Sequence, residues 1–185
     1  MSQIRRETRE TRIELSVTAG TGDPAAIGTG ERFLDHMLVT LARYAGLNLA
    51  VKAAGDLRHH LIEDVAITLG QALRQEFPQA SRRYGHAVLP MDDALVEAAL
   101  DIGGRGYYAG RLPSDLYEHF LRSFAHNAGL TLHVRVLRGR DRHHIVEAAF
   151  KATALALRQA MAVDEEIFST KGAVHWDESK GAGEA

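Results

Sequence analysis

The sequence contains no cysteine among its 185 residues. This absence excludes disulfide bonds, thiolate metal sites and cysteine nucleophiles. Histidine and carboxylate groups are the strong metal ligands that remain. Ten histidines are present, so any metal site in this chain must be built from imidazole nitrogens and carboxylate oxygens.

Long hydrophobic runs are also absent. No stretch approaches the roughly 18 consecutive apolar residues of a membrane-spanning helix. The first ten residues, MSQIRRETRE, are charged and lack the apolar core of a targeting segment. We therefore expect a cytoplasmic protein that does not enter a membrane.

Neither sign of charge dominates the chain. Its 22 basic and 24 acidic side chains are spread along the sequence and leave a formal charge of −2. This balance does not favour binding to nucleic acid or to a membrane by bulk electrostatics, so any recognition of phosphate must be local. The apolar fraction of 45% suits a buried core for one domain or for two small halves.

Apolar side chains follow two periods, in the same order in both parts of the chain. Alternation with a period of two predicts strands, and spacing of three to four residues predicts amphipathic helices. The expected strands cover residues 11–17, 47–53, 95–104 and 130–136, and the expected helices cover 31–46, 59–77, 114–129 and 143–161. Pro78 ends the second helix, and Ser114 is a candidate N-cap of the third. Helices on one face of a sheet predict an α+β sandwich.

The second part of the sequence repeats the first. His36, Gly46 and Val51 recur 83 positions later as His119, Gly129 and Val134. After an insertion of one residue, the offset is 84 positions, and His59, His60 and Glu63 recur as His143, His144 and Glu147. A period this long does not fit a solenoid repeat, so the chain is interpreted as two copies of one strand, helix, strand, helix unit.

The repeated polar residues have the chemistry of a metal site. On a helix, His59 can share a face with Glu63 at a spacing of four, and His60 can do so at a spacing of three. Adjacent histidines point about 100° apart, so each pair is suited to two different ions, and the two halves would ligate a pair of metals jointly. Imidazole with carboxylate suits Mn, Fe, Zn, Co or Ni. The predicted ligands are His36, His59, His60, Glu63, His119, His143, His144 and Glu147.

A single His-His-x-x-Glu motif also arises by chance, because helix N-termini tolerate polar residues. Two copies in register, each with a third repeated histidine, favour the metal site instead. Four histidines have no counterpart in the other half and are predicted to be surface or structural residues: His86, His126, His133 and His175.

With these motifs in view, the sequence resembles a known family. DHM at 35–37, EHF at 118–120, GRGYY at 104–108, STKG at 169–172 and the two His-His-x-x-Glu motifs together resemble imidazoleglycerol-phosphate dehydratase. The resemblance implies two duplicated ββαβα halves, similar to the second domain of ribosomal protein S5. It also implies trimers within a homo-oligomer of 24 subunits, and two Mn(II) ions per active site at subunit interfaces, held by the eight residues above.

The resemblance also implies a reaction and its residues. The substrate is a small phosphate ester, imidazole glycerol phosphate, which loses water to become imidazole acetol phosphate through an imidazolate and a diazafulvene-like intermediate. Glu10 matches the acid/base residue. Arg83, Arg105, Ser169 and Lys171 match the phosphate-binding residues. From the residues alone, Glu10 and Lys171 resemble exposed charged side chains.

Some features differ from the family pattern or leave other functions open. About three residues are missing before Arg58, and Val39 and Thr40 replace a common polar pair. We expect residues 1–84 and 85–172 to be the two halves of one catalytic domain, residues 173–185 to be a tail, and the chain to lack a fused phosphatase. The competing functions are a non-catalytic metal-binding or storage cage, which would need long helices throughout, and a dinuclear phosphate-ester hydrolase, which would need an aspartate-rich site.

Overall fold

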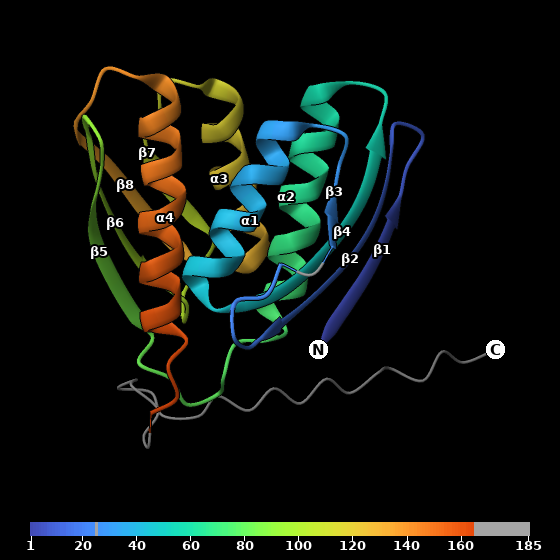
Figure 1. The fold of residues 1–185 in the computed structure, drawn as a ribbon. Coiled ribbons are helices and arrows are strands. Elements are labelled where there is room, and N and C mark those ends of the chain that lie inside the picture. Colours follow the sequence, from blue (N-terminus) through green and yellow to red (C-terminus); the bar gives the residue numbers. More distant parts are fainter. Residues whose placement is uncertain (25, 165–185) are drawn as a thin grey trace.

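Two four-stranded sheets enclose four helices in the computed structural model, which describes residues 1–24 and 26–164 (Figure 1). In chain order the elements are β1 (Ser2–Glu7), β2 (Thr11–Ala19), β3 (Ala26–Gly28), α1 (Arg32–Ala45), β4 (Leu47–Gly55), α2 (Arg58–Arg74), β5 (Tyr84–Met91), β6 (Ala94–Asp101), β7 (Tyr107–Gly110), α3 (Asp115–Ala128), β8 (Thr131–Arg138) and α4 (Arg142–Ala160).

The two sheets have the same topology. The first has the order β1-β2-β4-β3 and the second the order β5-β6-β8-β7. In each sheet the first two strand pairs are antiparallel, while the short edge strand, β3 or β7, runs parallel to its neighbour. The α+β fold of two similar ββαβα halves is confirmed. Each half also carries a short extra strand, β3 or β7, and the alternation of apolar residues predicted neither these strands nor β1 and β5.

Alternating side chains in β2 direct one face of the first sheet toward the helices. Ile13, Leu15 and Val17 are buried, whereas Arg12 and Glu14 between them are exposed. The predicted apolar stripe of α2 is confirmed, because Ile62, Val65, Ala66, Leu69 and Leu73 all have no exposed surface. Full burial of one such aliphatic side chain contributes about 1.5–3 kcal/mol, so these two faces fix how α2 lies on the sheet.

Helices pair across the halves rather than within them. α2 packs against α3, and α1 packs against α4. Each pair is parallel, so the four helices begin at the same end of the molecule (Figure 1). α1 and α3 end at Gly46 and Gly129, which adopt the left-handed conformation with φ of 70° and 67°. The last-turn residues Arg158 of α4 and Arg74 of α2 lie beside these two glycines, one in each pair.

The α2–α3 pair comes unusually close at Gly70. A Cβ atom at this position would lie 2.7 Å from the carbonyl oxygen of Phe124 and 2.9 Å from the backbone nitrogen of Ala128. Both contacts are with backbone, which cannot rotate away as a flexible side chain can. Glycine at position 70 therefore sets the separation of the two helices.

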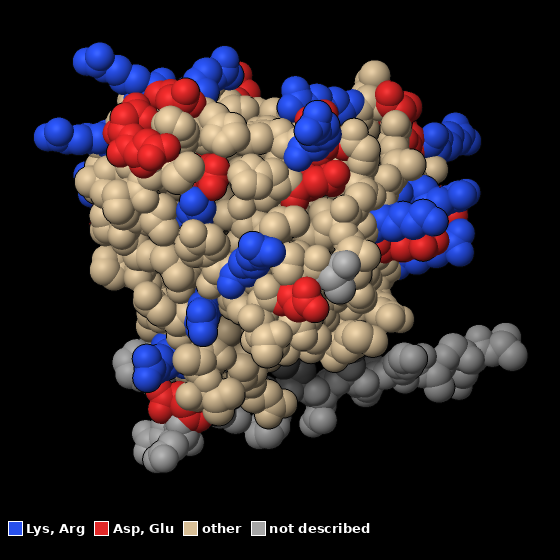
Figure 2. Space-filling model, viewed as in Figure 1, with Lys and Arg blue, Asp and Glu red and all other residues tan. Residues whose placement is uncertain are grey.

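The described residues include no helix that is long and apolar enough to cross a membrane. Figure 2 shows charged side chains of both signs around the edges of one face, and a few of each sign nearer its centre. Acidic side chains gather at the upper left of this view, at the end of the molecule where β5 meets β6 and α4 begins (Figures 1 and 2).

We predict that Gly70→Ala destabilises the protein by about 1–3 kcal/mol, because the added methyl group must push α3 away from α2. Urea unfolding followed by circular dichroism measures this change. Gly28→Ala is the matched control, since a Cβ atom at position 28 has no neighbour within 4 Å. Equal stability of the two variants would show that the α2–α3 contact does not depend on the glycine.

Candidate metal centre

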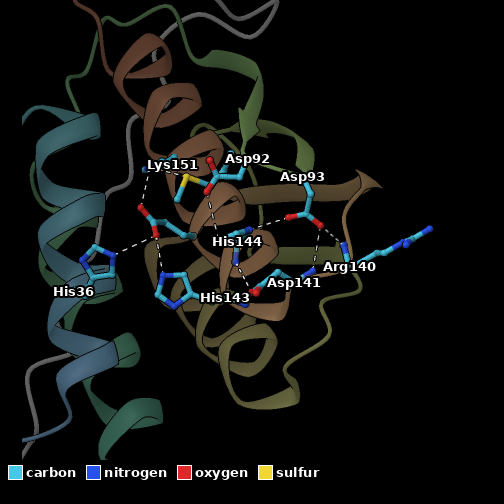
Figure 3. Close-up of polar contacts among 10 residues, drawn as sticks. His36, Asp92, Asp93, Arg140, Asp141, His143, His144 and Lys151 are labelled. Carbon is cyan, nitrogen blue, oxygen red and sulfur yellow. Dashed lines mark hydrogen bonds and ion pairs between the residues drawn. The ribbon is translucent and has the colours of Figure 1, made fainter.

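The first two turns of α4 present two candidate ligands on one face. Asp141 is the N-cap, and its carboxylate accepts hydrogen bonds from the backbone N–H groups of His143 (2.7 Å) and His144 (3.3 Å). The helix then places Glu147 one turn after His143, with 3.1 Å between Glu147 Oε2 and His143 Nε2. His36 of α1 reaches the same carboxylate oxygen from the other half, at 3.3 Å. We call His36, His143 and Glu147 the α4 cluster (Figure 3).

The pseudo-equivalent residues on α2 and α3 form a second group, the α2 cluster of His59, Glu63 and His119. Glu63 Oε2 lies 3.5 Å from His59 Nε2, and Glu63 Oε1 lies 3.1 Å from His119 Nε2. His119 Nε2 is buried and makes no hydrogen bond of acceptable geometry within the described residues. A buried nitrogen beside a carboxylate, but not hydrogen-bonded to it, suits a cation that would lie between them.

Each cluster could hold a metal ion. One ligand atom from each residue lies within 4.8 Å of the others in both groups. Two imidazole nitrogens and one carboxylate oxygen suit borderline divalent ions such as Mn, Fe, Co or Zn. Each cluster joins the His-x-x-x-Glu face of one half to a histidine of the other half, as expected for two halves that bind metals jointly.

The second histidine of each pair points away from its own chain's cluster. The rings of His143 and His144 are perpendicular, with an interplanar angle of 90°, and those of His59 and His60 are inclined at 75°. Each glutamate therefore pairs with the histidine four residues before it on its own helix, and not with the histidine three residues before it. His60 and His144 lie outside the clusters and are the less exposed members of their pairs, at 28% and 30% against 56% for His59 and 50% for His143.

Carboxylates hold the two histidines that lie outside the clusters. Asp56 Oδ1 accepts from His60 Nδ1 at 2.9 Å, and Asp93 Oδ1 accepts from His144 Nδ1 at 2.8 Å. Each hydrogen bond raises the pKa of its histidine above the ordinary value. The bond from His144, with backbone N–H donors, lowers the pKa of Asp93 to about 2.

The two clusters differ in charge at the buried carboxylate. Lys151 Nζ lies 2.8 Å from Glu147 Oε1, and Glu147 is only 8% exposed. Burial acts to raise the pKa of Glu147, but the hydrogen bonds from Lys151 and His36 outweigh it and leave the pKa below the ordinary value. The corresponding residue of α2 is Ile67, so in the described part of the chain Glu63 has no ammonium partner of this kind.

Glu10 lies in the β1–β2 turn, at the ligand end of the molecule. Its carboxylate is 54% exposed and lies 3.6 Å from His60 Nδ1. The turn is held through its backbone, because the Thr8 hydroxyl accepts from the N–H groups of Glu10 (3.1 Å) and Thr11 (3.0 Å). Thr11 in turn donates to the buried carboxylate of Asp64, the residue after Glu63. The backbone of Glu10 is therefore anchored beside the α2 cluster while its carboxylate stays accessible.

The predicted phosphate residues lie at the other end of the second sheet. Arg83 makes two hydrogen bonds with Asp101, of 2.8 and 3.0 Å, and its backbone N–H donates to the carbonyl of Ala160 at the end of α4. Arg105 is exposed in the turn before β7. Ser169 and Lys171 lie outside the described residues.

The described histidines without a counterpart in the other half lie apart from both clusters. His86, His126 and His133 are exposed, as predicted, and His175 lies outside the described residues. Sequence reasoning missed Asp93 and Lys151. Lys151 could have been found, because it follows Glu147 by four positions on one helix. No local sequence pattern indicates Asp93, because it lies in the β5–β6 turn, 51 positions before His144.

Comparison with known proteins identifies the family. A sequence model of imidazoleglycerol-phosphate dehydratase matches residues 29–157. The chain belongs to this family. The dehydratases of Granulibacter bethesdensis and Desulforamulus reducens are 48% and 44% identical to it, over 92% of this chain and 97% and 96% of theirs. Members of the imidazoleglycerol-phosphate dehydratase family are hydro-lyases of histidine biosynthesis.

Solved structures of dehydratases agree with the fold. The enzyme from Pyrococcus furiosus aligns with a TM-score of 0.83 and 40% identity, over 92% of this chain and all of its own. The enzyme from Staphylococcus aureus aligns with a TM-score of 0.80 and 34% identity, over 88% of this chain and 99% of its own.

We predict that His119→Ala lowers the affinity for one of two bound metal ions by at least about 100-fold, because the α2 cluster loses a ligand. Metal content after dialysis against limiting Mn(II), measured by mass spectrometry, checks this. His126→Ala is the matched control, since His126 lies on the same helix and is exposed. Unchanged metal content in the His119 variant would exclude the α2 cluster as a metal site.

Proposed function

We propose that the chain converts imidazole glycerol phosphate to imidazole acetol phosphate in the cytoplasm, with two Mn(II) ions per active site. Family membership supports the reaction. The observation that carries the metal part is the pair of pseudo-equivalent clusters, each with two imidazoles around one carboxylate. A dehydratase of this kind needs two ligand sets that face one substrate ring, and the duplication supplies two.

Each cluster has three ligands in one chain, and His60 or His144 of a neighbouring chain supplies a fourth. The position of His60 and His144 supports this, because both lie at the ligand end but outside the clusters. A hydrogen bond donated by Nδ1 leaves Nε2 with the lone pair that binds a metal. The full ligand set of the assembly is then the eight repeated residues.

The phosphate residues support sharing of the active site between chains. Arg83 is hydrogen-bonded to Ala160, which lies about 20 Å along α4 from Glu147 at 1.5 Å per residue. The substrate is shorter, because the few bonds of about 1.5 Å between its ring and its phosphate span less than about 10 Å. This separation favours a site in which different chains hold the two ends of one substrate. Arg83, Arg105, Ser169 and Lys171 would bind the phosphate of a substrate whose ring is held by other subunits, consistent with a homo-oligomer of 24 chains built from trimers.

The chemistry requires a proton to leave a carbon that has no adjacent carbonyl group. A hydroxyl group leaves the carbon attached to the imidazole, a proton leaves the next carbon, and the resulting enol becomes the ketone. Bound metal ions would supply Lewis acidity that favours the imidazolate form of the ring. Glu10 carries the protons in these steps, because its carboxylate is accessible and lies beside a metal-ligand histidine.

The decisive experiment measures turnover of imidazole glycerol phosphate by chelator-treated protein, before and after addition of Mn(II). We expect metal-dependent formation of imidazole acetol phosphate without release of inorganic phosphate. Glu10→Gln should keep both ions and lower kcat by about 100- to 10,000-fold, because the amide cannot transfer the proton.

Two variants and two readouts separate the alternatives. Arg105→Ala should raise KM and retain both ions, because Arg105 contacts phosphate and no metal. Phosphate release in place of dehydration would indicate a hydrolase, and two bound ions without any turnover would indicate a storage protein. A near-normal kcat for Glu10→Gln would contradict the role assigned to Glu10.

A further inference from the structure

Carboxylates occupy the same place in the two halves, in the turn that joins the first two strands of each sheet. Glu10 lies in the β1–β2 turn and Asp93 in the β5–β6 turn. Glu10 Oε2 is 3.6 Å from His60 Nδ1, whereas Asp93 Oδ1 is 2.8 Å from His144 Nδ1. The duplicated fold has thus placed a turn carboxylate beside His60 and beside His144, but of Glu10 and Asp93 only Asp93 makes a hydrogen bond to its histidine. Asp92, in the same turn as Asp93, lies 3.4 Å from His144 Nε2.

The loops before α2 and α4 explain the difference. In the first half Asp56, four residues before His60, accepts the hydrogen bond from His60 Nδ1. Its counterpart 84 residues later is Arg140, which has no carboxylate to offer. The side chain of Arg140 points away from the histidines in Figure 3. His144 takes its carboxylate from the β5–β6 turn instead.

Asp93 is fixed at both of its oxygen atoms. Oδ1 accepts from His144, and Oδ2 accepts from the backbone N–H groups of Arg140 (2.6 Å) and Asp141 (3.2 Å) (Figure 3). A carboxylate held in this way ties the β5–β6 turn to the start of α4. These three hydrogen bonds engage both oxygen atoms of Asp93, whereas the carboxylate of Glu10 is 54% exposed.

We propose that Asp93 is a positioning residue, which holds the His144 ring so that Nε2, 3.4 Å from the exposed carboxylate of Asp92, can serve as a ligand for the metal of a neighbouring chain. Asp56 performs this task for His60, and Glu10 is left free for proton transfer. The inference rests on the proposed function, since it takes His144 as a ligand and Glu10 as the acid/base. The two halves have the same fold, but their turn carboxylates have different roles: Glu10 transfers protons and Asp93 positions His144.

The test compares Mn(II) binding and kinetics in Asp93→Asn and Asp56→Asn, with Asp115→Asn at the start of α3 as the control. Electron paramagnetic resonance of free Mn(II) reports affinity directly, without substrate. Each of the first two variants should lose about 10- to 100-fold in affinity for one ion per chain, and retain most of its kcat at saturating Mn(II). Asp115→Asn should match the unsubstituted protein.

A rescue separates positioning from a general loss of structure. Arg140→Asp, added to Asp93→Asn, places a carboxylate four residues before His144, as Asp56 stands before His60. The double variant should recover most of the lost Mn(II) affinity. Arg140→Asp alone should bind Mn(II) normally.

Other outcomes would overturn the inference. Normal Mn(II) affinity in Asp93→Asn would show that His144 needs no carboxylate. Normal affinity with a kcat as low as that of Glu10→Gln would make Asp93 a proton carrier. Failure of the Arg140→Asp rescue would also count against positioning. If the unsubstituted protein bound two ions but did not dehydrate the substrate, the proposed reaction would be wrong. The comparisons of Mn(II) binding would still test whether Asp93 positions His144.

Discussion

A glutamate carboxylate held between two imidazole rings, one from each half of the chain, is the interaction on which the rest of the structure depends. It occurs twice, at Glu63 and at Glu147. It can form only if α2 lies parallel to α3 and α1 parallel to α4, with their first turns level. The two sheets hold the four helices in that arrangement, and close backbone contact at Gly70 brings His119 within reach of Glu63.

The same geometry supports the proposal that active sites are shared between chains. Adjacent histidines on a helix point in different directions, so a His-His pair that gives one ring to its own cluster directs the other elsewhere. The candidate phosphate residues Arg83 and Arg105 lie away from the clusters, at the other end of the second sheet. One chain thus carries its candidate metal ligands at one end and its candidate phosphate donors at the other, which suits the proposed assembly. In such an assembly, metal binding, oligomerisation and activity would be hard to separate.

Much of the fold was predictable, because its signals are local or repeated. Strict alternation predicted β2, β4 and β8, and the offset of the two halves located all eight candidate ligands. β1 was missed because its charged residues Arg5, Arg6 and Glu7 hide its alternation, and β3 is too short to show any. The sequence left open whether His59 or His60 pairs with Glu63, which only helix geometry in three dimensions decides. Asp93 and Asp101 could not be found, since their partners are distant in sequence.

The most direct test of the account is a crystal structure of the Mn(II)-loaded protein with anomalous scattering recorded at the manganese edge. The account predicts two peaks per chain, each bound by the three residues of one cluster and by His60 or His144 of another chain. Peaks ligated within a single chain, or peaks away from Glu63 and Glu147, would contradict it.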